Sequence, residues 1–277
     1  MVATPIGNLR DITLRALDVL RSVDLVAAED TRHTRRLLDH HGISAKLLAS
    51  HEHNERGAGE RIVAALAAGH SVALVTDAGT PAISDPGSVV VRCARAAGFA
   101  VVPVPGASAA IAAISAAGLD QTGFLFLGFL PSRTDARRRM VETFAVSVVP
   151  VVLYEAPHRV RESLNDLLAV LGAERRVTVC RELTKLFESI HEIALGDAVE
   201  WLDADGNRER GEFVLVVHAA IADDTAAVRE ASRILALLAQ DLPASQAAKL
   251  AARITGGRRN ELYAEALRLK PEPEENE

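Results

Sequence analysis

The chain has 277 residues, of which 49% are hydrophobic and 25% are charged, which is typical of a globular enzyme and excludes a largely disordered chain. Its formal net charge of −6 argues against a protein that coats nucleic acid without specificity. The apolar runs are too short to cross a membrane, and two cysteines are too few for a disulfide framework. Because the first residues contain no signal-like region, we expect a cytoplasmic protein without membrane contact.

The first part of the chain alternates short β-branched runs with amphipathic stretches of helical period. Strands are expected at 25–28, 47–50, 72–76 and 100–104, and helices at 13–22, 31–41, 59–68, 88–97 and 107–117. Strands that are separated by helical crossovers predict a parallel sheet with helices on both faces. We therefore expect an α/β domain over residues 1–118.

A second α/β domain is predicted over residues 119–222. Its expected strands are 124–129, 148–154, 177–181, 189–194 and 212–218. Little helix separates the strands between residues 176 and 194, so a mixed or antiparallel sheet is expected.

The pattern becomes entirely helical after residue 222. Helices are expected at 225–240, 244–255 and 260–269, the last two joined by a Gly-Gly-Arg-Arg turn as in a helix-turn-helix. Residues 225–270 carry eight Lys or Arg against four Asp or Glu, whereas the tail 271–277 carries four Glu and no basic residue. We expect a small C-terminal helical domain over 223–277 that ends in a disordered acidic tail.

Three Gly- and Pro-rich loops follow predicted strands: 4–8, 77–87 and 103–109. In open α/β sheets the ligand crevice lies at the carboxyl ends of the strands, although glycine and proline also simply terminate strands. The chain contains no G-x-x-x-x-G-K-[ST] or G-x-G-x-x-G pattern, which disfavours a dinucleotide or a nucleoside triphosphate. A ligand with an adenosine and an amino-acid end but no phosphate fits these loops better.

Polar residues follow the predicted strands 25–28 and 47–50, at positions 29–36 and 51–56. His51 and His53 have a His-x-His spacing, but no third ligand stands at a usual distance in sequence, so no metal site is predicted. Asp30 or Thr31 could instead cap the following helix. A second basic cluster follows residue 131, for which a solvated helix face is the alternative to a binding role.

Five motifs occur together in this chain: Thr-Pro-Ile-Gly-Asn-Leu at 4–9, Ala-Glu-Asp-Thr-Arg at 28–32, Ser-His-Glu-His-Asn-Glu at 50–55, Asp-Ala-Gly-Thr-Pro at 77–81 and Tyr-Glu-Ala-Pro-His-Arg at 154–159. Together they resemble the bacterial ribosomal small-subunit methyltransferase I family, within the tetrapyrrole methylase superfamily. The resemblance implies two α/β domains with S-adenosylmethionine bound in a cleft between them. It also implies a homodimer that methylates the 2′-hydroxyl of a cytidine in the decoding centre of 16S rRNA.

The resemblance also implies which residues contact the cofactor. They are Pro5, Ile6, Gly7, Gly79, Thr80, Pro81, Ile83, Ser108, Ala109, Tyr154, Gly211 and Glu212.

Candidates for the chemistry and for RNA contact follow from residue type. A ribose hydroxyl is a weak nucleophile that benefits from a general base, and His53, Glu29 and Lys185 are the candidates. The favoured pair is His53 with Glu29, because a nearby carboxylate raises the basicity of a histidine. Phosphate contacts are expected from basic side chains, namely Arg32, Arg35, Arg36, Arg133, Arg137, Arg138 and Arg139.

Two other functions stay open at this point. C-methylation of a tetrapyrrole would use the same fold, but the first loop is not the Gly-Pro-Gly-Asp type and the basic helical appendage has no evident use there. A ligand-sensing regulator would combine a small-molecule domain with a DNA-binding helix pair.

Overall fold

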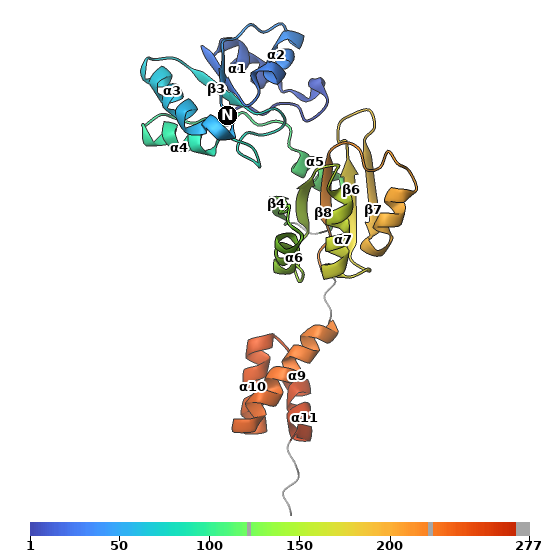
Figure 1. The fold of residues 1–277 in the computed structure, drawn as a ribbon. Helices are drawn as coiled ribbons and strands as arrows, with labels where there is room; N and C mark the ends of the chain where they lie inside the picture. The colour runs from blue at the N-terminus through green and yellow to red at the C-terminus, as the bar shows by residue number, and fades with distance from the viewer. Residues whose placement is uncertain (121–122, 221–223, 270–277) are drawn as a thin grey trace, which may run out of the picture. The chain divides into compact units, whose positions relative to one another are not determined.

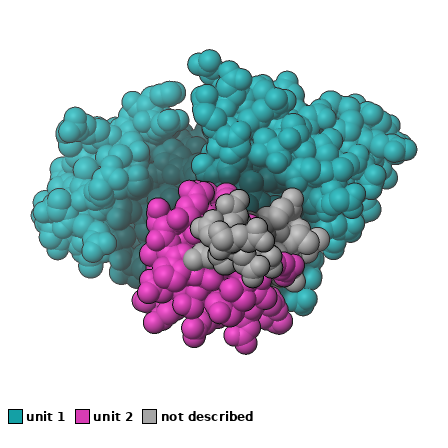
Figure 2. All heavy atoms as spheres, turned by 90° about the horizontal axis from the view of Figure 1, so that it is seen from below, with its two compact units in different colours: residues 1–219 teal, residues 220–277 magenta. Residues whose placement is uncertain are grey.

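The computed structural model describes residues 1–120, 123–220 and 224–269. Its contacts divide the chain into two compact units, residues 1–219 and 220–277, which Figure 2 colours separately. Both predicted sheets lie in the first unit, and the predicted boundary between residues 118 and 119 stays a prediction. The acidic tail at 271–277 lies outside the described residues. No helix of the described part is long and apolar enough to cross a membrane.

The first sheet has three parallel strands in the order β2-β1-β3. They are β1 (Leu25–Ala28), β2 (Leu47–Ala49) and β3 (Val72–Val75). Around it lie α1 (Leu14–Ser22), α2 (Thr31–His40), α3 (Glu55–Ala67) and α4 (Ser88–Ala96), with short 3-10 turns η1 (Leu9–Asp11) and η2 (Glu52–Asn54). The predicted parallel sheet is confirmed.

Alternate residues of these strands point to opposite faces of the sheet, which explains why both faces are covered. Val26 and Ala28 pack in one cluster with Leu20 of α1 and Leu38 of α2. Ala27 packs in the other cluster with residues of α3 and α4. Asp30 caps α2, accepting a hydrogen bond from the Arg32 backbone N–H at 2.7 Å.

The strand expected at 100–104 does not form. In its place Val104 makes an isolated bridge with Val2, in which the Val104 N–H donates to the Met1 carbonyl at 2.8 Å. Pro103 and Pro105 flank this position. Residues 102 and 104 bond to residues 1–3, and on the opposite edge the two prolines have no N–H to donate, so this segment can pair on one side only.

The second sheet has five strands in the order β4-β5-β8-β6-β7. They are β4 (Leu125–Phe129), β5 (Val151–Glu155), β6 (Arg176–Arg181), β7 (Ser189–Ala194) and β8 (Phe213–Val217). Strands β4 and β5 are parallel and the other pairs are antiparallel, so the predicted mixed sheet is confirmed. Its helices are α5 (Ala109–Ala116), α6 (Thr134–Thr143), α7 (Val160–Leu171), η3 (Leu195–Asp197) and α8 (Ala198–Asp203).

The two faces of this sheet belong to separate cores. Val151 and Leu153 pack with Leu164 of α7 in the larger cluster, to which α6 and α8 also contribute. Val152 instead packs with Ala113 of α5, which lies against β5 and β8 (Figure 1). Helix α5 therefore brings the loop that precedes it, residues 105–108, to the edge of the second sheet.

Within the described residues, the second unit consists of α9 (Asp224–Asp241), α10 (Ala244–Thr255) and α11 (Arg259–Leu269). Its core is built mainly from alanine and leucine, including Leu235 of α9, Ala247 of α10 and Ala266 of α11. Helix α10 ends at Gly256, which adopts the left-handed conformation with φ of 75°. This conformation favours glycine at a helix end and produces the predicted sharp turn.

Candidate active site

A cavity of about 310 Å³ lies in the first unit, bordered by the loops that follow β3 and β5, by the end of β4 and by the start of β8. Its walls are formed by Ile6, Ala78, Gly79, Thr80, Ile83, Asp85, Ser108, Ala109, Phe129, Tyr154, Glu155, Ala156, Pro157, Leu183, Glu212, Phe213 and Val214. Both halves of the first unit contribute, which is the arrangement expected for a ligand site in α/β proteins.

Most residues predicted to contact the cofactor line this cavity. They are Ile6, Gly79, Thr80, Ile83, Ser108, Ala109, Tyr154 and Glu212. Pro5, Gly7, Pro81 and Gly211 do not line it. Gly7 has a packing role instead, because a Cβ there would lie 2.5 Å from Cγ of Lys185.

Several wall residues were not singled out from the sequence, notably Asp85, Phe129, Glu155 and Phe213. Strand pairing explains the last two. Glu155 at the end of β5 pairs with Phe213 at the start of the antiparallel β8. The start of an antiparallel strand lies beside the end of its neighbour, so a rule that searches only the residues after strands misses Phe213 and Val214.

The loops around the cavity are fixed by backbone contacts and contain strained residues. Gly79 and Thr4 exchange two backbone hydrogen bonds of 2.9 and 3.0 Å, and the Thr80 hydroxyl donates to the Ala107 carbonyl at 3.1 Å. Ala82 and Ser84 adopt positive φ values of 67° and 64°. Glu182 and Thr184 do the same, at 52° and 68°. Such non-glycine strain persists only where the surroundings impose it, and it concentrates at functional sites.

An aromatic wall closes one side of the cavity. The ring centroid of Tyr154 lies 5.0 Å from that of Phe126 and 5.7 Å from that of Phe129. The Tyr154 hydroxyl accepts a hydrogen bond from the Ala110 N–H at 3.2 Å, at the start of α5. Burial raises the pKa of Tyr154, so this hydroxyl stays neutral at physiological pH.

The charges of the cavity indicate which ligand it suits. Three wall residues are acidic, namely Asp85, Glu155 and Glu212, and no Lys or Arg is among the wall residues. A phosphate would find no cation there, whereas a positively charged ligand would be stabilised. S-adenosylmethionine has a sulfonium, an ammonium and a carboxylate, so that its net charge is positive, and it has no phosphate. The apolar and aromatic walls and this acidic character therefore fit that cofactor.

Two further hydrogen bonds organise the carboxylates at the carboxyl edge of the first sheet. The Asp77 N–H donates to Glu29 at 3.3 Å, and the Asp30 N–H donates to Asp77 at 3.0 Å. Burial is the main cause that raises the pKa of Glu29. Burial also raises the pKa of Asp85 to about 6, and the charges of Glu29 and Asp77 contribute.

The predicted general bases occupy three different settings. His53 is exposed on η2, and Glu29 accepts the Asp77 backbone N–H; neither lines the cavity, and no hydrogen bond joins these two described side chains. Lys185 donates to Glu182 at 2.8 Å and to Glu212 at 2.7 Å. Burial lowers the pKa of Lys185, but these hydrogen bonds outweigh it and raise that pKa. Lys185 is thus held in its charged form, which cannot accept a proton.

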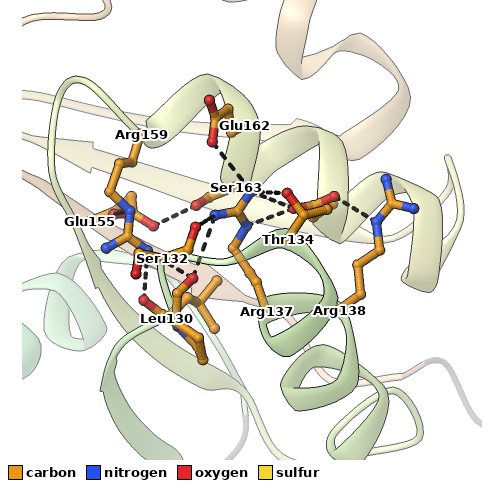
Figure 3. Close-up of polar contacts among 11 residues, drawn as sticks. Leu130, Ser132, Thr134, Arg137, Arg138, Glu155, Arg159, Glu162 and Ser163 are labelled. Atoms are coloured by element: carbon orange, nitrogen blue, oxygen red, sulfur yellow. Dashed lines mark hydrogen bonds and ion pairs between the residues drawn. The ribbon is translucent and has the colours of Figure 1, made fainter.

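Arg137 is buried and structural, and this corrects its predicted role as an RNA contact. Its side chain is 1% exposed, and its guanidinium donates to Asp166 at 2.6 Å and to the Ser132 carbonyl at 3.1 Å (Figure 3). Its neighbour Arg138 also donates to Asp166, at 2.7 Å, from a half-exposed position. The helical period explains the difference, because residue 137 points directly at α7, Arg138 reaches Asp166 of α7 from the border of that face, and Arg139 is exposed.

A related set of contacts joins the motif at 154–159 to the loop after β4 (Figure 3). The Arg159 guanidinium donates to the Leu130 carbonyl at 2.6 Å and lies 3.4 Å from the Glu155 carboxylate. The Ser163 hydroxyl donates to Glu155 at 2.5 Å. Glu155 is therefore a satisfied buried carboxylate, held in place at the cavity wall.

Arginines that remain exposed gather on α2. A separate cavity of about 560 Å³ is lined by Thr31, Arg32, Arg35, Arg36 and Leu47. The three arginines are three and four positions apart, which places them on one face of the helix. Arg32 is partly engaged with Asp30 at 2.9 Å and, through this hydrogen bond, lowers the pKa of Asp30 to about 2. Arg133 and Arg139 are also exposed, on α6 and its N-cap.

No three His, Cys, Asp or Glu side chains of the described residues are grouped in a way that could hold a metal ion. Cys180 is buried, which raises the pKa of its thiol to about 12, and Cys93 is partly buried. The thiol of Cys180 therefore stays protonated and unreactive.

Comparison with protein families gives two matches. Residues 1–199 match the profile of the tetrapyrrole (corrin/porphyrin) methylases, and residues 225–270 match that of the RsmI C-terminal HTH domain. The chain is 49% identical over 267 residues to the ribosomal RNA small subunit methyltransferase I of Escherichia coli O157:H7, covering 96% of this chain and 93% of that protein. It is 51% identical over 269 residues to the protein of the same name from Pseudomonas aeruginosa, with coverages of 96% and 95%.

Solved structures with the same fold are more distant in sequence. A uroporphyrin-III C-methyltransferase from Thermus thermophilus, complexed with S-adenosylhomocysteine, is 16% identical with a TM-score of 0.54 and covers 78% of this chain and 95% of its own. A diphthine synthase is also 16% identical, with a TM-score of 0.57 and coverages of 79% and 88%. These likenesses establish the fold.

Proposed function

The chain belongs to the ribosomal RNA small subunit methyltransferase I family, and on this premise we propose that it methylates the 2′-hydroxyl of a cytidine in the decoding centre of 16S rRNA. The enzyme class is that of an rRNA methyltransferase, and S-adenosylmethionine is the methyl donor. The observation that carries the donor site is the cavity with three acidic wall residues and no basic one. A structure of the same fold that contains S-adenosylhomocysteine supports this choice.

Methyl transfer from the sulfonium needs alignment more than activation, since the sulfonium is already a good leaving group. The protein's part is to hold the donor, orient the hydroxyl and exclude water. Ile6, Ile83 and Phe129 supply apolar surface to the cavity, and Gly79 brings the backbone close to it. The strained loops fix these residues before the ligand arrives, which reduces the ordering that binding requires.

The basic face of α2 is the proposed RNA contact in the first unit. Arg35 and Arg36 are exposed, and together with Arg32 they line the separate cavity at α2. Helix α2 follows β1 in the chain, so it begins at the edge of the sheet where Glu29 and Asp77 also lie. We expect Arg133, Arg138 and Arg139 to add phosphate contacts, because each residue is exposed, although Arg138 also bonds to Asp166.

The second unit is proposed to engage RNA as well. The exposed basic residues are Lys249 and Arg253 of α10, Arg258 before α11, and Arg259 at the start of α11. Phosphates bind well at clustered arginines, and the contribution is weakened by salt. Removal of residues 223–277 should leave donor affinity unchanged but lower methyl transfer to rRNA, most strongly at raised salt. Equal transfer by the truncated chain at all salt concentrations would rule out this role.

A homodimer in the cytoplasm is the proposed form of the protein. The β6–β7 hairpin exposes Leu186 to 89% and Phe187 to 68%, beside Ile190 at the start of β7. Adjacent exposed apolar side chains are typical of a protein interface. Light scattering should give twice the chain mass of 29.5 kDa, and a monomer at micromolar concentration would refute the dimer.

The function is tested by offering radiolabelled S-adenosylmethionine with three candidate partners. Small ribosomal subunits should accept the label, while a tetrapyrrole precursor and duplex DNA should not. Label in the tetrapyrrole would favour C-methylation, and a gel shift of DNA without any label transfer would favour a regulator.

A further inference from the structure

Asp85 differs from every other acidic residue at the cavity in having no partner. Glu155 accepts hydrogen bonds from Ser163 and from the Ala156 N–H, and Glu212 is paired with Lys185. The Asp85 carboxylate lines the same cavity and is half-buried, yet none of the described residues donates a hydrogen bond or an ion pair to it. A half-buried carboxylate without a protein partner is less well solvated than in water, so a ligand that donates a proton or carries positive charge would stabilise it.

The loop that carries Asp85 is built to hold it in this position. Ser84, the preceding residue, is strained at a φ of 64°. Glu55 accepts the backbone N–H groups of Gly87 and Val89 at 2.6 and 3.0 Å, which fixes the chain just after Asp85. On the other side, a Cβ on Gly128 would lie 2.7 Å from the Ser84 hydroxyl oxygen, so β4 approaches the loop closely.

We infer that Asp85 is the general base that accepts the proton of the substrate hydroxyl, an inference that rests on the proposed function. Among the described wall residues, no other side chain can accept this proton near neutral pH without breaking a hydrogen bond or ion pair that it already makes. Tyr154 stays protonated, and the Thr80 hydroxyl already donates to the Ala107 carbonyl. The residues favoured from the sequence, His53 and Glu29, do not line the cavity.

The step balances with the groups named. The 2′-oxygen forms a bond to the methyl carbon as the methyl–sulfur bond breaks, and the electron pair of that bond stays on sulfur as a neutral thioether. The hydroxyl proton passes to the Asp85 carboxylate and from there to solvent. A base of this kind contributes a rate factor on the order of 100 to 10,000.

The surroundings of Asp85 set its titration. Glu29 after β1 and Asp77 after β3 are the acidic neighbours that raise its pKa, after burial. Tyr154 of β5 also faces it, and the charge of Asp85 contributes to the raised pKa of that phenol. Glu155 and Glu212 share the cavity wall, and Lys185 offsets Glu212. A bound cation lowers the pKa of a carboxylate, so Asp85 should titrate near pH 6 in the free protein and lower in the complex.

The decisive variant is Asp85→Asn in the full chain, with small ribosomal subunits as substrate. In single-turnover reactions at saturating donor and RNA, the rate should fall on the order of 100-fold. The wild-type rate should decline toward acid pH as Asp85 is protonated, and this acid limb should be absent from the variant. By calorimetry, the dissociation constant of S-adenosylmethionine should change less than the rate does.

Asp77→Asn is the matched control, because it removes a neighbouring carboxylate that has a backbone partner. It should keep most of the rate but shift the acid limb to lower pH, since one charge that raises the pKa of Asp85 is gone. A merely structural role of Asp85 would not produce this shift. In the free protein, carbon NMR should show a carboxyl group that titrates near pH 6 and is missing from Asp85→Asn.

The inference is overturned if Asp85→Asn retains both the wild-type rate and the acid limb, or if its lost rate returns at higher donor concentration. The second result would make Asp85 a donor-binding residue. If the wild-type chain itself transfers no methyl group to small-subunit RNA, the proposed function fails, and the role of Asp85 as its base fails with it. An active wild type with an unaffected variant refutes only the role of Asp85.

Discussion

Arg137→Met should lower the free energy of unfolding by about 3 kcal/mol, the low end of the cost of removing one partner of a buried ion pair. Its guanidinium is almost fully enclosed, and the Asp166 carboxylate that it contacts is only 4% exposed. Arg138 also donates to Asp166, so the Asp166 carboxylate keeps one partner in the variant. For this reason we expect a loss at the low end of the usual range. The loss is measured by chemical denaturation, in which the dependence of the unfolding free energy on denaturant concentration should stay unchanged.

Arg139→Met is the matched control for this change. It alters the same residue type two positions along α6, at an exposed site, and should change stability by no more than about 0.5 kcal/mol. At temperatures where both variants are folded, Arg137→Met should bind rRNA as the wild type does. A variant that is as stable as the wild type but binds RNA weakly would restore Arg137 to the RNA interface.

Gly79→Val should weaken S-adenosylmethionine binding on the order of 100-fold, because strain of about 1–3 kcal/mol is added to a crowded loop. Gly79 has a φ of 79°, and both its backbone N–H and its carbonyl are hydrogen-bonded to the backbone of Thr4. Its φ angle therefore cannot change without breaking these two hydrogen bonds. A Cβ there would lie 3.4 Å from Ile6 Cγ2, and a branched side chain would push Ile6 into the cavity that it lines.

Gly98→Val separates the backbone effect from the effect on the cavity. Gly98 has a similar φ of 84°, but nothing lies within 4 Å of its Cβ position and it is not a wall residue. It should lose stability while keeping its donor affinity in calorimetry. Equal affinity losses in both variants would show that general destabilisation, and not the cavity, explains the result.

The fold was largely predictable because its strands are short, apolar and separated by clear helical patterns. Strand β1 at Leu25–Ala28 was predicted with its observed bounds, and the antiparallel β6–β7 pair follows from the lack of helix between them. The failure at 100–104 has a local cause in two prolines. Helices α7 and α8 were not among the predicted elements.

The candidate site was predictable where it depends on loops that follow strands, as at Gly79, Thr80 and Tyr154. It was not predictable where tertiary pairing decides, as at Phe213, which enters the wall only because β8 runs antiparallel to β5. Charge alone does not identify the arginines that can contact RNA. Arg137 and Arg139 belong to the same run of basic residues, and the sequence gives no reason to separate them. The packing of α6 on α7 shows that Arg137 is buried and Arg139 is exposed.

We propose that a donor bound in the first-unit cavity methylates one ribose hydroxyl of the small-subunit RNA. The most direct measurement incubates small ribosomal subunits that lack this modification with the full chain and labelled S-adenosylmethionine, and then maps the label to a single nucleotide. We predict one labelled cytidine in the decoding centre, resistant to alkaline cleavage on its 3′ side because its 2′-oxygen is methylated. At a donor concentration near the wild-type dissociation constant, Gly79→Val should give far less label. Label on a base, label at many nucleotides, or no label in the RNA would contradict the claim.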